Sequence, residues 1–450
     1  MNPNLHRQHG AVAIMVAVSM LVLLAVVGLC VDAGLAYLVK ARLNAAVDSA
    51  ALAGGRAVTN GNNQTEQIAS ARAAAADFFA ANIPSNYLLS SPRITSTTVT
   101  FNGGQATIDV RAEAPMPVSI MQIMNFTSLM PVAAAQTVRN DLDIAFVVDT
   151  SESLLGSASA VRSSAKSFLS KFNVTQDRVA LIHFASGAEV DNPINPTLRG
   201  FNRTSMNNNI SGYTFIGGTA SVEGMWNARD QLNDVPLANR STMRVIVFFS
   251  DGAPTAFGTY LKFNNTLDCR DAGTMDKAHG KFGLSKLDES RNEVPKEACR
   301  VFRNNAYAAR TLPDYYNAHD ADWKSAFDTK VREFPIVTRT PRSVTADFTN
   351  NYSRNIEMAA RNLAESVAAK ARDEGIYVFT LGMGAALKER NENDGDTGEM
   401  VLKCMANTVD APARCQKPDE RVGMYCYAAT DADLTPCFSR LASAILRITK

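Results

Sequence analysis

The most apolar stretch of the chain covers residues 11–31, where 21 successive residues carry no charge between Arg7 and Asp32. A helix rises 1.5 Å per residue, so this stretch would be about 31 Å long, enough to cross the hydrocarbon core of a bilayer. A cleaved signal peptide has a shorter apolar region, of roughly 7–15 residues. We therefore expect an uncleaved membrane-spanning helix. Because Lys40 and Arg42 follow the span, the distribution of positive charge leaves its orientation open.

Apolar residues continue at helical spacing beyond the span, up to the helix-breaking pair Gly54–Gly55. An alanine-rich segment at 64–82 predicts a second helix, which would pack back on the first. Alternating apolar and polar residues on both sides of 102–104 then predict a β-hairpin. We expect a membrane helix and stalk at residues 1–60, followed by a helix and a small β-rich segment at 61–140.

From residue 141 onward, short apolar runs alternate with segments of helical periodicity. Strands buried on both faces and separated by helices are typical of a parallel sheet that helices cover on both sides. We therefore predict an α/β fold with a doubly wound, mostly parallel sheet over residues 141–450. A polar stretch at about 255–353 shows no clear buried strand and is too long for a plain loop, so we expect an insertion there. The predicted strands include IAFVV (144–148), RVALIHFA (178–185), RVIVFFS (244–250) and IYVFTLGMG (376–384).

The cysteines indicate the compartment. One of seven, Cys30, lies in the apolar span, which leaves an even set of six. These six lack the close pairs of a zinc site, and an even set fits disulfides in an oxidising compartment outside the cytoplasm. We expect disulfides, including one between Cys269 and Cys299; six buried thiols in a reducing compartment are the alternative. The set is Cys269, Cys299, Cys404, Cys415, Cys426 and Cys437.

Charge and motif content argue against several functions. The formal net charge of +1 and the absence of a basic run give no support to nucleic-acid binding. No nucleophile–base set or phosphate-binding loop can be derived from residue spacing, so we expect a binding protein and not an enzyme. The acidic segment 391–399 lacks the spacing of an EF-hand calcium loop, and we expect it to be a solvated loop.

Oxygen-bearing side chains follow the predicted strands and precede a predicted helix. Asp149, Ser151 and Ser153 follow the first strand, and Asp251 follows the third. Thr219 stands before a predicted helix. Ligands of such sheets bind outside the carboxyl ends of the strands, so we expect these five side chains to converge. Two carboxylates and three hydroxyls suit a hard divalent cation, Mg²⁺ above all, with Mn²⁺ or Ca²⁺ as alternatives.

The motifs DTSES, the Thr of GGT and the Asp of SDG resemble, in that order, the metal-ion-dependent adhesion site of the von Willebrand factor A domain. The resemblance implies that Ser151, Ser153 and Thr219 present hydroxyls to the metal. It implies that Asp149 and Asp251 bind the metal directly or through water. The open coordination position would receive an aspartate or glutamate carboxylate from a partner protein.

The N-terminal segment is similar to that of TadG-like proteins of the bacterial tight-adherence (Flp) pilus system. It shares a Gly-led apolar helix from Gly10, an aspartate at its outer end, Asp32, and the string DSAALAG from Asp48. Processed pilins carry Glu where this chain has Met15, so we do not expect cleavage by a prepilin peptidase. The resemblance implies a single-pass bacterial membrane protein with a cytoplasmic N-terminus, its bulk in the periplasm or at the cell surface, and partners in pilus assembly or the envelope. A metal-independent structural scaffold in a cell-envelope complex is the alternative.

Overall fold

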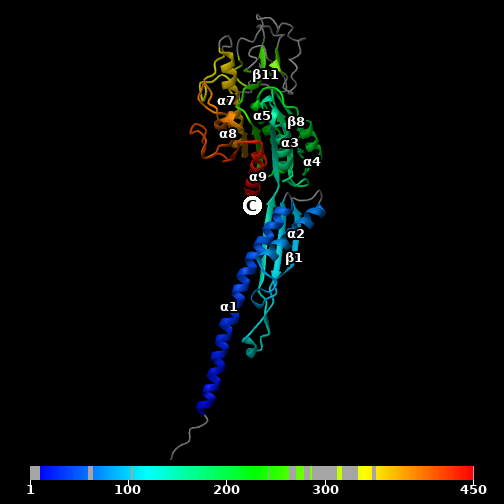
Figure 1. The fold of residues 1–450 in the computed structure, drawn as a ribbon, viewed down its shortest axis with the longest axis vertical. Coiled ribbons are helices and arrows are strands. Elements are labelled where there is room, and N and C mark those ends of the chain that lie inside the picture. The colour runs from blue at the N-terminus through cyan, green and yellow to red at the C-terminus, as the bar shows by residue number, and fades with distance from the viewer. Residues whose placement is uncertain are drawn as a thin grey trace, which may run out of the picture. The chain divides into compact units, whose positions relative to one another are not determined.

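The computed structural model divides the chain into two compact units, Met1–Arg139 and Asn140–Thr449 (Figure 1). Each unit has a hydrophobic core of its own, and the second unit has one core on each side of its main sheet. The structure describes residues 11–58, 64–102, 105–241, 243–262, 270–277, 284–285, 312–316, 333–346 and 351–448.

The first unit is built on one long helix. Helix α1 runs without a break over Ala11–Ala57, because its alanines and leucines favour helix and no proline interrupts it. From Val39 onward its apolar stripe packs against α2 (Gln64–Asn82) and a sheet in the order β1-β2-β5. The predicted return of the second helix onto the first is therefore confirmed. The strands are β1 (Arg93–Asn102), β2 (Gln105–Glu113) and β5 (Val132–Asn140), and β1 and β2 form the predicted antiparallel hairpin.

The N-terminal half of α1 leaves its apolar side chains uncovered. Among the described helices, α1 is the one that is long and apolar enough to cross a membrane. Its most apolar window is only 6% buried within the structure, whereas the core helix of a globular domain would be covered on at least one face. The exposed half is therefore a candidate membrane span by length and composition.

The carboxylate of Asp32 fastens a short hairpin to α1. Strands β3 (Met116–Pro117) and β4 (Ser128–Leu129) pair antiparallel, and the 3₁₀ helix η2 (Met121–Met124) lies between them. The two Asp32 oxygens accept hydrogen bonds from the three backbone N–H groups of residues 119–121, at 2.8–3.0 Å. Asp32 is 1% exposed, so these amide dipoles take the place of water around its charge.

We expect Asp32→Ala to speed amide hydrogen exchange at residues 119–121 by about 10- to 100-fold, because hydrogen bonds to a charged acceptor contribute about 1.5–3 kcal/mol. Mass spectrometry of the full chain in detergent measures the exchange. Asp48→Ala is the matched control, since Asp48 lies exposed on the same helix. Unchanged exchange in Asp32→Ala would show that the carboxylate does not hold the hairpin.

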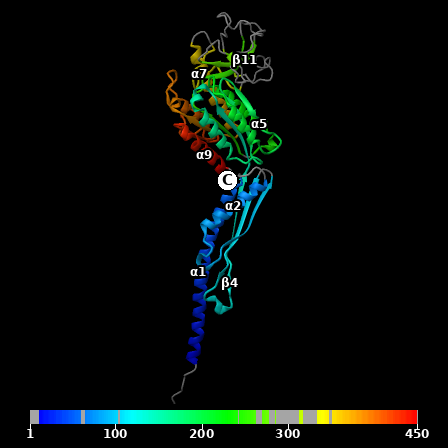
Figure 2. The ribbon, with the colours of Figure 1, turned by 45° about the vertical axis from the view of Figure 1, so that its right-hand side comes forward.

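The second unit is a six-stranded sheet in the order β14-β13-β9-β6-β7-β8, with helices on both faces (Figures 1 and 2). Adjacent strands from β14 to β7 run parallel, and the edge strand β8 is antiparallel. The predicted α/β fold with a mostly parallel, doubly wound sheet is therefore confirmed. The strands are β6 (Leu142–Asp149), β7 (Arg178–Phe184), β8 (Ala188–Asn192), β9 (Met243–Ser250), β13 (Ile376–Met383) and β14 (Met424–Ala428).

Alternate side chains of the central strand enter opposite cores. In β6, Ala145 and Val147 pack in the core with α5, α7 and α8, whereas Phe146 and Val148 pack in the core with α3, α4 and α9. All eight residues of β6 are buried, so the position of its carboxyl end is fixed from both sides. The helices are α3 (Ala158–Leu169), α4 (Arg203–Gly212), α5 (Ser221–Asp234), α7 (Tyr352–Asp373), α8 (Gly398–Ala406) and α9 (Asp431–Ile448).

The predicted insertion begins with strands that belong to the core. Strands β10 (Ala256–Lys262) and β11 (Arg270–Asp276) pair antiparallel, and β12 (Leu284–Ser285) pairs with β11. Phe257 is fully buried beside residues of α5 and α7. The expectation of no buried strand in this stretch is wrong at its start, because Phe257 of β10 and Met275 of β11 are both buried in the core. The predicted Cys269–Cys299 bridge lies outside the described residues.

Two disulfides are present in the C-terminal part of the chain. Cys404 at the end of α8 is bonded to Cys415, and Cys426 in β14 is bonded to Cys437 in α9. Both bridges close over a sequence separation of 11, with Cα–Cα distances of 5.2 and 5.7 Å. They confirm the prediction of disulfides and fit an oxidising compartment.

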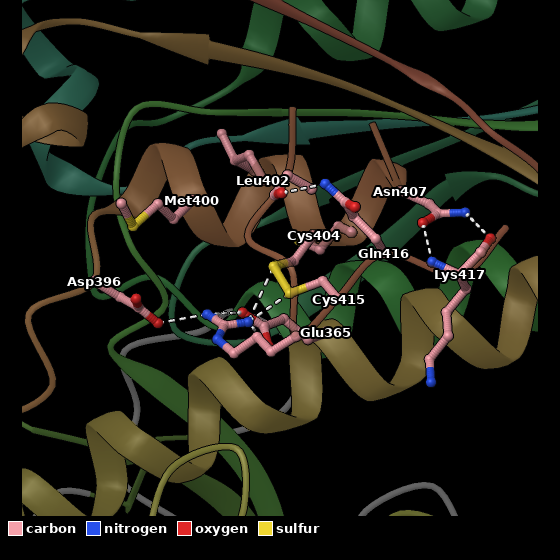
Figure 3. The surroundings of a disulfide bond; sticks show 12 residues. Glu365, Asp396, Met400, Leu402, Cys404, Asn407, Cys415, Gln416 and Lys417 are labelled. Carbon is pink, nitrogen blue, oxygen red and sulfur yellow. Dashed lines mark hydrogen bonds and ion pairs between the residues drawn. A yellow bond between two sulfur atoms is a disulfide. The ribbon is translucent and has the colours of Figure 1, made fainter. Parts of the chain in front are cut away.

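The acidic segment 391–399 is not a solvated loop. Arg342 lies buried between two of its carboxylates, with Nε 2.5 Å from Asp394 and Nη2 2.6 Å from Asp396. Arg414 also pairs with Asp396, next to the Cys404–Cys415 bridge (Figure 3). Burial alone would raise the pKa of Asp396, but the hydrogen bond and charge of Arg414, with those of Arg342, outweigh it and hold the pKa below its usual value. The expectation for this segment is corrected: Asp394 and Asp396 are paired with arginines, and Glu399 is paired with Lys403.

Candidate metal-binding site

The central strands bring two aspartates to one edge of the sheet. Asp149 is the last residue of β6, and Asp251 follows the last residue of β9. These two strands are parallel neighbours, with Val148 opposite Phe249. Asp149 is therefore next to Ser250, and the chain that leaves β9 carries Asp251 past the end of β6. This is the edge at which parallel α/β sheets bind ligands.

Hydrogen bonds join four of the five predicted residues. Asp149 Oδ1 accepts from the backbone N–H of Ser151 at 2.8 Å, and Ser151 Oγ lies 3.2 Å from Ser153 Oγ. The Ser153 hydroxyl donates to Asp251 Oδ1 at 2.9 Å, which closes the connection between the two loops. The hydroxyl of Ser250 donates to Asp149 Oδ2 at 2.5 Å.

Thr219, the fifth predicted residue, lies on the loop before α5 beside the same cluster. A Cβ added at Gly252 would lie 3.7 Å from Thr219 Oγ1, so the threonine hydroxyl faces the turn that carries Asp251. The carbonyl of Gly217 accepts the N–H of Glu152 at 3.2 Å, which ties the Thr219 loop to the loop after β6. Gly217 has a φ of +94°, a conformation that glycine adopts without strain.

The two carboxylates repel each other in a buried setting. Burial raises the pKa of Asp149 well above its usual value, and the charge of Asp251 raises it further. Burial also raises the pKa of Asp251, although hydrogen bonds from Ser153 and Ser151 oppose the shift. The hydrogen-bonding groups described above are neutral hydroxyls and one amide. A cation between the two carboxylates would compensate both charges, which none of these neutral donors can do.

The donor set fits a hard divalent cation. Every candidate ligand atom is an oxygen, and carboxylate and hydroxyl oxygens are the ligands that Mg²⁺ and Mn²⁺ accept. Asp149 and Ser151 are buried at the base of the cluster, whereas Ser153 is exposed. A cation held here by Asp149, Ser151, Ser153, Thr219 and Asp251 would therefore be reachable from solvent on the Ser153 side.

Another cluster with ligand-type side chains offers no metal site. Glu365, Cys404 and Cys415 lie close together, but both sulfur atoms are joined in the disulfide and neither can act as a thiolate (Figure 3). Arg414 pairs with Glu365 at 3.1 Å and neutralises the remaining carboxylate.

Two family models match separate parts of the chain. The model described as von Willebrand factor type A domain matches residues 144–253, which contain all five predicted site residues. The model described as putative Flp pilus-assembly TadE/G-like matches residues 10–57. The chain carries a TadE/G-like N-terminus and a von Willebrand A domain. The predicted von Willebrand A domain and the TadE/G-like N-terminus are thereby confirmed, and the metal site within the domain stays a prediction.

Solved structures similar to this chain include the pilus adhesin SpaC of Lactobacillus rhamnosus GG, at 14% identity and a TM-score of 0.39. That match covers 80% of this chain but only 35% of SpaC, so the chain spans about a third of the adhesin's length. The von Willebrand domain of the type V pilus tip protein Mfa5 from Porphyromonas gingivalis matches at 16% identity and a TM-score of 0.38, over 70% of this chain and 98% of that domain. No curated protein matches the chain.

Sequence reasoning missed one contributor to the site of the von Willebrand A domain. Ser250 was assigned only to the end of the strand RVIVFFS, yet its hydroxyl bonds the buried Asp149 directly. Its place beside Asp251 in the SDG motif was the available signal. Ser250 positions Asp149 by a hydrogen bond to Oδ2, while the other oxygen, Oδ1, accepts the Ser151 amide.

We expect Asp251→Asn to raise the melting temperature of the metal-free chain by roughly 2–5 °C, because it removes one of two like charges from a buried site. Mg²⁺ at ten times its dissociation constant should stabilise the wild type by about 1.4 kcal/mol and should leave the variant unchanged. Calorimetry in EDTA and in Mg²⁺ measures both effects. Glu189→Gln, an exposed change on the edge strand, is the control. An equal Mg²⁺ shift in Asp251→Asn would exclude this site.

The raised pKa values of Asp149 and Asp251 set the expected pH dependence. A carboxyl whose pKa is raised by folding favours the folded state when protonated, so the contribution of this pair to metal-free stability should be lost as the pH rises from about 4 to about 8. Comparison of the wild type with Asp251→Asn isolates that contribution. Mg²⁺ requires the ionised forms and competes with the protons, so its affinity should increase as the pH rises towards the Asp149 pKa of about 8. Titration calorimetry at several pH values checks the trend, and an affinity independent of pH would contradict it.

Proposed function

We propose that the chain is a membrane-anchored, extracytoplasmic component of pilus assembly or surface attachment. Its von Willebrand A domain would bind a partner protein through a divalent cation, Mg²⁺ above all. The observation that carries this proposal is the joining of Asp149, Ser151, Ser153 and Asp251 at the carboxyl edge of the sheet. The two matched families support the general role in pilus assembly or adhesion.

Two features of the structure support anchoring outside the cytoplasm. The apolar half of α1 is uncovered, and the same helix continues into the packed core of the first unit. A retained membrane anchor accounts for the uncovered half, and cleavage of that half as a signal peptide need not be assumed. The disulfides Cys404–Cys415 and Cys426–Cys437 suit an oxidising compartment, which supports the proposal that the second unit lies on the outer side of the membrane.

The residues present suit binding without a chemical step. A divalent cation supplies a Lewis-acidic point that attracts anionic oxygen. Ser151, Ser153 and Thr219 would contribute neutral oxygens, and these leave much of the positive charge uncompensated. Asp149 and Asp251 would hold the cation at the base, while the exposed Ser153 side stays open. An aspartate or glutamate side chain of a partner protein is the ligand that complements this arrangement.

A capture experiment with envelope proteins tests the proposal. The wild-type chain and Glu189→Ala should retain a partner in Mg²⁺ and release it in EDTA, because the partner's carboxylate needs the cation. Asp251→Ala should capture at least tenfold less partner than the wild type, because the variant lacks one of the cation's ligands. Circular dichroism confirms that each variant is folded. Capture that survives both EDTA and Asp251→Ala would instead support the metal-independent scaffold.

A further inference from the structure

The hairpin fastened by Asp32 is apolar and lacks charge. No Asp, Glu, Lys or Arg stands between Glu113 and Arg139. We call residues 116–130, from β3 through η2 to β4, the tip. Two side chains of the tip are largely exposed although they are apolar: Phe126 at 49% and Met130 at 59%. An uncharged loop that presents large apolar side chains to water is unusual for a surface exposed only to solvent.

The tip contacts α1 inside its apolar stretch. Ile120 packs against Gly28, where an added Cβ would lie only 2.5 Å from the isoleucine Cγ2. Gly28 is the first buried residue of α1 among those the structure describes, and Asp32 holds the tip backbone one helical turn further on. Gly28 lies three residues before Val31, the end of the apolar stretch, which is about 5 Å along a helix. The tip therefore reaches the level at which the predicted span ends.

We propose that the tip is a second membrane contact, which inserts Phe126 and Met130 into the outer interface of the bilayer beside α1. This inference rests on the membrane anchoring proposed above. A bilayer is the occupant that the geometry favours, because the tip packs on α1 at Gly28 and Asp32, where the exposed apolar stretch of the helix ends. Aromatic and large apolar side chains without charge are suited to that boundary.

The contact would give the stalk a fixed orientation. A single helix can rotate and tilt in a bilayer, and its tilt is set by neighbouring elements and interfacial anchors. The three hydrogen bonds to Asp32 and the Ile120–Gly28 contact join the tip to one face of α1. A tip held in the interface would therefore restrict rotation of α1 and of the helix and sheet that pack on it.

Tryptophan quenching by brominated lipids tests the inference in vesicles that contain the full chain. The readout is the quenching that each added tryptophan contributes beyond the parent, which has two tryptophans of its own. Three variants are compared: Phe126→Trp in the tip, Leu21→Trp in the predicted span and Phe78→Trp on α2. Phe78 is 52% exposed and lies beside Leu52, about 30 Å along the helix beyond Val31, so it is the matched water-exposed control.

The inference predicts that bromine on the upper acyl carbons quenches at least half of the added Phe126→Trp signal. Bromine near the chain ends should quench Leu21→Trp, and neither lipid should quench Phe78→Trp. If Leu21→Trp is quenched and Phe126→Trp is not, the tip contact is wrong while the anchor stands. If neither is quenched, the anchor itself fails and the inference fails with it. A blue-shifted but unquenched Phe126→Trp would mean that protein covers the tip, which also overturns the proposal.

Discussion

Repulsion between Asp149 and Asp251 is the constraint on which the functional account depends. Strands β6 and β9 are neighbours, so the fold itself forces these carboxylates to one edge of the sheet. Burial of β6 from both faces removes the freedom to move them apart. The hydroxyls of Ser250 and Ser153 bond the carboxylates without neutralising them. Protonation relieves this repulsion, and burial together with the repulsion raises the pKa of Asp149; we propose that a bound cation relieves the repulsion too, and that a partner would recognise the remaining positive charge.

Asp32 is also a buried aspartate, but hydrogen bonds compensate its charge and its role is structural. Three backbone amides surround its carboxylate, and the result is a firm attachment between α1 and the tip. Asp394 and Asp396 are likewise satisfied, by Arg342. In these three described cases, backbone amides or an arginine side chain compensate the charge of the carboxylate, and the contact joins distant parts of the chain. Asp149 and Asp251 differ, because burial raises their pKa values and their hydrogen-bond partners are neutral; we therefore propose them as the pair that binds a cation.

The sequence predicted those features that depend on local pattern. Runs such as IAFVV and RVIVFFS predicted the strands, and the three oxygen-bearing motifs predicted candidate residues that the fold brings to one edge of the sheet. It failed where the deciding partner is distant along the chain. Segment 391–399 looked like a free acidic loop because Arg342 precedes it by about 50 residues. The hydrogen bonds from residues 119–121 to Asp32 could not be predicted either, because every residue type except proline has a backbone N–H.

Anomalous diffraction from crystals of the full chain grown with Mn²⁺ tests the central claim most directly. Mn²⁺ accepts the same oxygen ligands as Mg²⁺ and scatters anomalously, so its position can be located without assumption about the site. The account predicts one strong peak between Asp149 and Asp251, within about 2.0–2.4 Å of the Ser151 and Ser153 hydroxyls. A well-ordered site without a peak, or with its peak elsewhere on the second unit, would contradict the claim that these carboxylates are built to hold a cation.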